Sequence, residues 1–364
     1  MKKIPYTIFG FDHCEMYVGN AKQASHYYQS TMGFNLVAYQ GLETGNRETV
    51  SYVLNQGLIN LVLTSPLVKN TEIGKHIDRH GDGMKAISFL VDDATIAWDE
   101  SIKRGAQSEF EPKTLEDENG SIIMSAIRTF GDTVHSFIER KKYNGIFLPG
   151  FKDIDKSKKI QNTDLVHIDH VVGNQPSGEM KTVCKFYENV FGWHRFWSVD
   201  DKDINTKYSS LRSIVMANNN EKIKIPINEP ADGLKISQIQ EFIDYYDDSG
   251  VQHLALSTKN IIKTVEKMRE NGVDFLPTPK SYYEKLEKRI GTIDEDIAEL
   301  SRLGILVDKD ENGYMLQIFT KPLQDRPTLF FEIIQRKGSN SFGKGNFKAL
   351  FKSIEREQQK RGNL

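Results

Sequence analysis

The chain has 364 residues, enough for two domains with substantial cores, and its 38% hydrophobic and 27% charged residues are ordinary for a globular protein. Its net charge of −2 gives no reason to expect nucleic acid or an anionic membrane as a partner. Cys14 and Cys184 form no CxxC pair, which argues against a disulfide framework. No apolar run suits a signal peptide or reaches transmembrane length, so we expect a cytoplasmic protein.

Three segments of the first half recur, in the same order, in the second half. The matching pairs are Phe11–Phe34 with Ile168–Trp193, Gly83–Ala106 with Gly250–Val273, and Thr133–Arg140 with Leu329–Arg336. The first two pairs each begin as a strand and continue as a helix-like stretch, and chance would not repeat three segments in one order. We therefore predict two related domains, 1–150 and 151–364, with a polar, lysine-rich linker at 150–164.

The run TLFFEIIQR in the second half contains one carboxylate, Glu332, among apolar, β-prone residues. In a strand Glu332 shares a face with Phe330 and Ile334, where an ionised carboxylate is costly unless a partner compensates it. Arg336 lies on the same face and is the ordinary candidate for that partner. A metal cation is the alternative.

The repeat favours the metal. It aligns the potential ligands of the second half with these residues of the first: His170 with His13, His253 with Ala86, and Glu332 with Ser136. A lone histidine on an apolar strand is usually a core residue, but three potential ligands at repeat-equivalent positions reverse that expectation. Two imidazoles and one carboxylate on one side of a metal are typical of non-haem Fe(II) oxygenases. His13 then belongs to a half that binds no metal.

Another histidine pair, His76 and His80, stands at helical i,i+4 spacing in GKHIDRHGDG. The stretch is charged and lacks the HExxH pattern of zinc proteases. We interpret both residues as surface histidines.

With these residues in place, the chain resembles the 4-hydroxyphenylpyruvate dioxygenase family of the vicinal oxygen chelate superfamily. The resemblance covers nearly the whole chain and is carried by HIDHVVGNQ, RFWSVDD, YSSLRSIVMA, PINEPADGLKISQIQEFI, GVQHLAL, GILVDKDENGYMLQIFTKPLQDRPTLFFEIIQR and SFGKGNFKALFKSIE. It implies an α+β fold of two related halves of paired βαβββ modules, each half an open β-barrel flanked by helices. It also implies one Fe(II) per chain, held by His170, His253 and Glu332, and a C-terminal gating helix.

The resemblance further implies a substrate pocket in the second half. The polar residues that would orient the substrate are Ser213, Asn228, Gln238, Gln252 and Gln317. The aromatic residues that would line the site or close over it are Phe319, Phe330, Phe342 and Phe347. The resemblance also implies Asn346 as a site residue. Asn346 is a plausible N-cap of the last helix, whose apolar face would include Phe347, Leu350, Phe351 and Ile354.

The reaction implied by the resemblance converts 4-hydroxyphenylpyruvate and dioxygen to homogentisate and carbon dioxide, in tyrosine and phenylalanine catabolism. The substrate supplies its own two electrons, so no separate reductant is needed. Family members of this kind lead us to expect a homo-oligomer, a dimer or a tetramer.

Three other functions compete with this one. Hydroxymandelate synthase shares the ligands but oxidises the benzylic carbon, and Pro226 and Phe347 favour the dioxygenase branch over it. An extradiol ring-cleaving enzyme would lack the C-terminal GKGNFKALF segment. A metal-free, drug-sequestering module is disfavoured because all three ligands are retained in one half.

Overall fold

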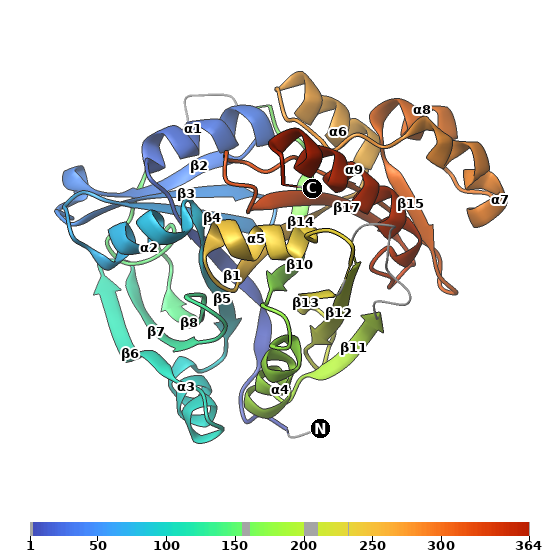
Figure 1. The fold of residues 1–364 in the computed structure, drawn as a ribbon. Coiled ribbons are helices and arrows are strands. Elements are labelled where there is room, and N and C mark those ends of the chain that lie inside the picture. The colour runs from blue at the N-terminus through green and yellow to red at the C-terminus, as the bar shows by residue number, and fades with distance from the viewer. Residues whose placement is uncertain (1–2, 155–160, 200–209, 232, 364) are drawn as a thin grey trace.

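The structure is a computed structural model that describes residues 3–154, 161–199, 210–231 and 233–363. Residues 155–160 of the predicted linker, and parts of the RFWSVDD, YSSLRSIVMA and PINEPADGL motifs, lie outside the described residues. The chain forms two curled sheets with helices on their outer sides, the first half from blue to teal and the second from green to red (Figure 1). None of the described helices is long and apolar enough to cross a membrane.

The first sheet is built from residues of the first half. Its strands are β1 (Ile8–Tyr17), β2 (Asn35–Gln40), β3 (Thr49–Gln56), β4 (Ile59–Pro66), β5 (Gly83–Val91), β6 (Ser108–Asp117), β7 (Gly120–Arg128), β8 (Val134–Tyr143) and β9 (Lys152–Asp153). Among the described residues they pair in the order β6-β7-β8-β5-β1-β4-β3-β2-β9. The start of the predicted linker thus contributes a short strand, β9, to the first sheet.

The second sheet repeats this plan. Its strands are β10 (Leu165–Asn174), β11 (His194–Val199), β12 (Ser210–Ala217), β13 (Lys224–Ala231), β14 (Gly250–Thr258), β15 (Leu306–Lys309), β16 (Tyr314–Phe319) and β17 (Phe330–Lys337). In the described part of the chain their order is β11-β12-β13-β10-β14-β17-β16-β15.

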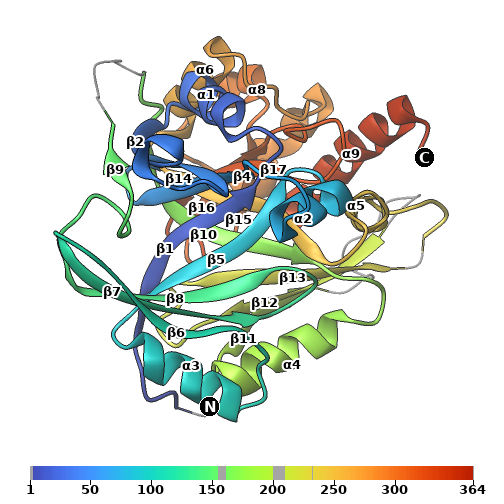
Figure 2. The same cartoon turned by 90° about the vertical axis from the view of Figure 1, so that its left-hand side faces the viewer.

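Helices flank both sheets (Figure 2). The α-helices are α1 (Ala21–Met32), α2 (Glu72–His80), α3 (Ala94–Lys103), α4 (Met180–Val190), α5 (Gln238–Tyr246), α6 (Ile261–Glu270), α7 (Leu286–Ile290), α8 (Ile297–Leu303) and α9 (Phe347–Arg361). Short 3₁₀ turns occupy Leu42–Thr44, Lys280–Lys285 and Lys344–Asn346. Local sequence sets the helix ends: Asn20 accepts a hydrogen bond from the Gln23 N–H at the start of α1, and Gly33, with φ of 74°, ends it.

A βαβββ module occurs twice in each half. The modules are β1-α1-β2-β3-β4, β5-α3-β6-β7-β8, β10-α4-β11-β12-β13 and β14-α6-β15-β16-β17. The first and last strands of a module pair in parallel, and the first strands of the two modules in a half pair antiparallel. The predicted fold class is confirmed.

Strand register supports the sequence alignment of the halves. His13 lies opposite Ser88 in the first sheet, and His170 lies opposite Ala255 in the second. Likewise Ser136 is paired with Ser88 as Glu332 is paired with Ala255. Each candidate ligand therefore has the structural equivalent that the repeat predicts.

One hydrophobic core joins the two halves. The largest buried cluster contains residues of both sheets. Across the seam, the Phe89 ring of β5 lies 5.9 Å from Trp193 and the Tyr28 ring of α1 lies 6.0 Å from Phe331 of β17. Such interdigitated aromatic packing fixes one half against the other.

Candidate metal centre

Three neighbouring strands bring the predicted ligands together. β14 lies between β10 and β17, and His253, His170 and Glu332 come from these strands in that order. Glu332 Oε2 lies 3.3 Å from His170 Nε2 and 3.4 Å from His253 Nε2. All three side chains are buried, with exposed fractions of 3% for His170 and Glu332 and 9% for His253. The alternation of strand side chains thus directs three ligands to one point.

Hydrogen bonds orient both imidazoles for metal binding. His170 Nδ1 lies 2.7 Å from Asp169 Oδ1, and His253 Nδ1 lies 3.1 Å from Gln252 Oε1. Because a carboxylate or amide oxygen accepts, each Nδ1 carries the proton and each Nε2 presents a lone pair toward Glu332. Metal-bound histidines are held in this way, so the residues fit a metal ion.

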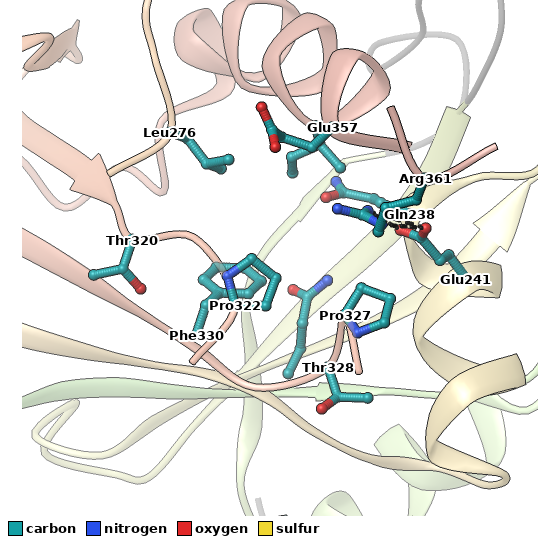
Figure 3. Close-up of a pocket in the computed structure, with 12 residues that line it drawn as sticks. Gln238, Glu241, Leu276, Thr320, Pro322, Pro327, Thr328, Phe330, Glu357 and Arg361 are labelled. Carbon is teal, nitrogen blue, oxygen red and sulfur yellow. Dashed lines mark hydrogen bonds and ion pairs between the residues drawn. The ribbon is translucent and has the colours of Figure 1, made fainter. Parts of the chain in front are cut away.

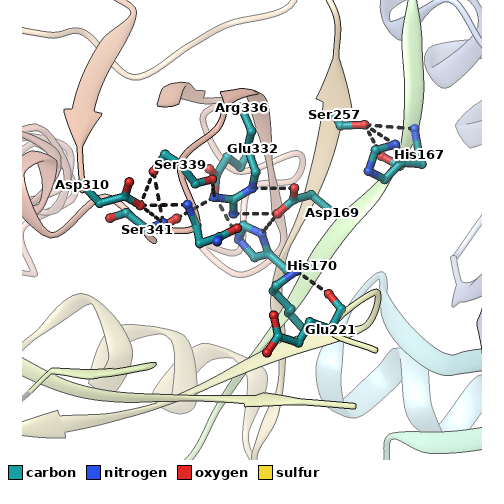
Figure 4. Close-up of polar contacts among 12 residues, drawn as sticks. His167, Asp169, His170, Glu221, Ser257, Asp310, Glu332, Arg336, Ser339 and Ser341 are labelled. Carbon is teal, nitrogen blue, oxygen red and sulfur yellow. Dashed lines mark hydrogen bonds and ion pairs between the residues drawn. The ribbon is translucent and has the colours of Figure 1, made fainter. Parts of the chain in front are cut away.

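The ordinary candidate for the Glu332 partner is wrong. Arg336 binds Asp169 instead, with nitrogens 2.8 Å and 2.9 Å from the two carboxylate oxygens (Figure 4). It also donates to the carbonyl oxygen of Ser341, 2.6 Å away. Burial would raise the pKa of Asp169, but Arg336 and His170 hold it well below its usual range. Asp169 is therefore ionised and accepts from His170.

Glu332 is ionised as well. Complete burial would raise its pKa, yet when His170 and His253 are protonated on Nε2 as well, their charge and hydrogen bonds outweigh burial and lower the pKa to about 2. A metal ion would take the place of those Nε2 protons. The negative charge of this buried carboxylate must then be balanced by a cation that lies between Glu332 and the two imidazoles. This donor set of two nitrogens and one carboxylate oxygen suits a divalent transition metal.

The first half keeps the supporting contacts but only one of the three ligand residues, His13. Asp12 accepts from His13 Nδ1 at 2.6 Å, and Arg140 holds Asp12 as Arg336 holds Asp169. His13 Nε2 lies 3.0 Å from the Ser88 hydroxyl rather than from a carboxylate. The other two ligand positions are Ala86 and Ser136, as the sequence alignment predicts.

A cavity adjoins the triad. Among its described lining residues are the following predicted pocket residues: Ser213, Asn228, Gln238, Gln252, Gln317, Phe319, Phe330, Phe342 and Phe347. Pro226, which the sequence analysis used to choose between branches, lines it too. The structure thus brings nearly all of the predicted pocket residues to one place.

Asn346 is the exception. It is buried, and its side chain contacts Gln317 Oε1 at 3.4 Å and the Tyr282 hydroxyl at 2.6 Å, one layer behind the cavity. Asn346 stands at the N-cap position of α9, as predicted, but it has helical backbone angles and its side chain makes no capping hydrogen bond. The 3₁₀ turn before α9 leaves the side chain pointing inward instead of toward the helix start.

The sequence analysis missed several cavity residues, of which Trp197 is the largest. Its ring lies 5.8 Å from Phe342 and 6.3 Å from Phe347. Leu211, Val172 and Val215 also line the cavity. The sequence could have indicated Val172, because it shares the strand face of His170. Trp197, Leu211 and Val215 lie on strands that carry no ligand.

A second cavity shares Gln238, Gln252 and Phe330 with the first. It lies beneath the end of α9 and beside the loop that carries Pro322 and Pro327 (Figure 3). The described lining also includes Glu241, Leu276, Thr320, Thr328, Ile354, Glu357 and Arg361. The helix end and this loop therefore flank a space that adjoins the metal-site cavity.

The interpretation of His76 and His80 as surface residues is wrong. They are 7% and 0% exposed, because α2 turns this face toward β1 and the C-terminal end of α5. The charged neighbours that suggested a surface helix lie on its other side.

Paired βαβββ modules around a buried His-His-Glu triad define a metal-dependent enzyme of the vicinal oxygen chelate type. Comparison with known proteins agrees. Residues 167–318 match the family model "Glyoxalase/Bleomycin resistance protein/Dioxygenase superfamily", and residues 3–156 match "Hydroxyphenylpyruvate dioxygenase, HPPD, N-terminal".

Individual relatives narrow the class. The chain is 50% identical to 4-hydroxyphenylpyruvate dioxygenase of Yarrowia lipolytica, over 98% of this chain and 93% of that protein. It is also 50% identical to the enzyme of that name from Dictyostelium discoideum, over 98% of this chain and all of that protein. A solved variant of 4-hydroxymandelate synthase from Streptomyces coelicolor superposes with a TM-score of 0.85 at 29% identity, over 96% of this chain and 99% of that one. The chain belongs to the 4-hydroxyphenylpyruvate dioxygenase family, and the predicted resemblance is confirmed.

Proposed function

We propose that this chain converts 4-hydroxyphenylpyruvate and dioxygen to homogentisate and carbon dioxide, with Fe(II) held by His170, His253 and Glu332. Family membership supports the reaction, and the convergence of the three buried ligands is the observation that carries the site. The two products account for every atom of the two substrates. Oxidative decarboxylation of the 2-keto acid and hydroxylation of its ring together supply the electrons that reduce dioxygen. Bound iron would supply the redox chemistry of dioxygen and open coordination positions for substrate.

The protein's part begins with the ligands. Asp169 fixes the His170 ring, and Arg336 fixes Asp169 and neutralises its charge. Gln252 accepts from His253, so this amide both orients a ligand and lines the substrate cavity. Such contacts hold the ligand set in one geometry while substrate enters and product leaves.

The cavity suits a phenyl ring with polar groups at both ends. Phe319, Phe330, Phe342, Phe347 and Trp197 provide apolar walls for the ring. The polar residues that would hold the phenol hydroxyl and the keto acid are Ser213, Asn228, Gln238, Gln252 and Gln317.

Helix α9 covers this cavity. Leu350 and Ile354 pack against Phe319 and Phe330 of the sheet. Arg361 near the helix end holds Glu241 of α5 at 2.8 Å. We propose that α9 gates the site and excludes water during turnover.

Two experiments test the function. Under anaerobic conditions, Fe(II) and then 4-hydroxyphenylpyruvate are added to metal-free protein, and a visible charge-transfer band is the expected result. In air, chromatography should show homogentisate, with one dioxygen consumed per carbon dioxide released. Mainly 4-hydroxymandelate would instead assign the chain to the synthase branch, which the 29% identical structural neighbour represents.

The domain division at residue 150, the cytoplasmic location and assembly into a dimer or tetramer remain predictions from the sequence.

A further inference from the structure

A second group of potential metal ligands lies far from the first along the chain. His76 and His80 stand one turn apart on α2, and Asp132 lies in the turn between β7 and β8. One ligand atom of each residue lies within 4.8 Å of those of the other two. Both imidazoles are buried, and the half-exposed Asp132 side chain stands at the mouth of the cluster.

His80 is already oriented as a metal ligand would be. Its Nδ1 donates to the carbonyl oxygen of Tyr246 at the end of α5, so Nδ1 carries a proton. Its Nε2 lies 2.8 Å from Asp132 Oδ2. Because Nδ1 already donates, the contact between Nε2 and the carboxylate requires either a second proton or a metal ion on Nε2.

His76 lacks the partner that a buried imidazole needs. Its Nε2 is buried and has no hydrogen-bond partner among the described residues, and its ring centre lies 4.5 Å from that of His80. The ring centres of Tyr17 and Tyr246 lie 5.3 Å and 6.4 Å from that of His76. Aromatic faces and edges of this kind do not replace a polar partner, so the Nε2 nitrogen is available to a metal ion.

We propose that His76, His80 and Asp132 form a second divalent-metal site, of the kind that binds zinc. Two histidines at i,i+4 on a helix and one carboxylate are a common zinc donor set, and water would complete the coordination. The metal would replace the contact between His80 and Asp132 and connect α2 to the β7–β8 turn.

Arg79 is the competing cation. Its Nη1 lies 3.2 Å from Asp132 Oδ2. Arg79 also binds Asp247 at 2.9 Å and Asp248 at 3.0 Å, so it keeps two carboxylate partners when Asp132 turns to a metal. The negative charges of Asp247 and Asp248 also offset the positive charges of Arg79 and of the metal ion.

Zinc stoichiometry tests the proposal. The full chain is stripped with a chelator and equilibrated with Zn(II) alone, and bound metal is counted by atomic spectroscopy. Wild type should bind two zinc ions per chain. His76→Gln and His170→Ala should each bind one and the double variant none, while exposed His26→Gln, on α1, is the control and should bind two.

One zinc in wild type, or two in folded His76→Gln protein, would overturn the proposal. Because a buried substitution can impair folding, a second measurement uses Co(II) in the His170→Ala background, where the triad site is disabled. Tetrahedral Co(II) absorption in the visible is expected there, and it should disappear in the further variant Asp132→Asn, whose side chain is half exposed. No such absorption in folded His170→Ala would show that the cluster is a hydrogen-bonded contact only.

Discussion

At the residue scale, the two halves of the chain provide their own control for the metal ligands. His170→Ala, His253→Ala and Glu332→Ala should each abolish turnover and lower iron content, because each removes one of three donors. His13→Ala, at the repeat-equivalent position, should keep iron binding and turnover, since Ala86 and Ser136 leave it without co-ligands. Iron analysis and homogentisate formation measure both effects. A folded Glu332→Ala protein with full iron content and normal dioxygen consumption would contradict the ligand assignment.

A second matched comparison uses the aspartates that accept from the two histidines, Asp169 behind His170 and Asp12 behind His13. Asp169→Asn should weaken Fe(II) affinity by about 10- to 100-fold, since the amide no longer holds the His170 ring through a charged acceptor. Asp12→Asn disturbs the same arrangement around His13 and Arg140 and should leave Fe(II) affinity unchanged. Fe(II) titration of the two metal-free variants gives the comparison. Equal affinity in Asp169→Asn and Asp12→Asn protein would mean that Asp169 does not support the metal.

The sequence could identify the ligands because the two halves can be compared position by position. His253 and Glu332 stand where the first half has Ala86 and Ser136. It could not identify the partner of Arg336, since Glu332 and Asp169 are both carboxylates within reach of one long side chain. The burial of His76 and His80 was equally hidden. It depends on α5, a helix from the other half, covering α2.

At the scale of elements, α9 is the segment whose role most needs a test. Phe347 and Phe351 lie one turn apart on it, but Phe347 lines the substrate cavity whereas Phe351 packs behind it on Leu211 and Ile239. Phe347→Ala should lower the homogentisate formed per dioxygen consumed, because water and solvent gain access to the reacting ring. Simultaneous oxygen-electrode and product measurements give this ratio.

The matched control is Phe351→Ala. It should cost stability, about 3–5 kcal/mol for a fully buried phenylalanine, while the ratio of product to dioxygen stays at the wild-type value. Wild-type coupling in folded Phe347→Ala protein would leave α9 as a packing helix only. Equal loss of coupling in both variants would point to general loosening instead of a gate.

The sequence predicts the buried faces of strands and helices better than it predicts where a helix begins. The alternation in β10, β14 and β17 and the apolar face of α9 are local, and their prediction needed only periodicity. The start of α9 is not local. Lys344–Asn346 form a 3₁₀ turn because Asn346 finds buried partners in Gln317 and Tyr282, so its side chain serves the core and not the helix end.

At the scale of the whole molecule, the seam between the halves carries a titratable group. His135 of β8 is fully buried, with Nδ1 3.1 Å from the Ile87 carbonyl oxygen and Nε2 2.8 Å from the Tyr187 hydroxyl of α4. The neutral ring satisfies both partners, donating to Ile87 and accepting from Tyr187. A second proton would displace the Tyr187 hydroxyl hydrogen bond and place an unpaired charge in an aromatic cluster that includes Phe89 and Phe191.

This burial predicts how stability depends on pH. Burial lowers the pKa of His135 from 6.5 to about 3, the hydrogen bond to Ile87 opposing it only in part. Between these two values the unfolded chain binds a proton that the folded chain does not, so stability is complete above pH 6.5 and falls as the pH drops toward 3. At pH 5 the loss from this one residue is about 2 kcal/mol. Urea unfolding at pH 7 and pH 5 should show that loss in wild type and in the control His26→Gln, which changes an exposed histidine of α1. His135→Gln should not show this part of the loss of unfolding free energy. The glutamine amide can donate and accept hydrogen bonds, but it takes up no proton between pH 7 and pH 5. The carboxylates and His76 contribute equally to all three proteins and cancel in the differences. If wild type and His135→Gln lost the same free energy of unfolding between the two pH values, His135 would not be a source of the stability lost in acid.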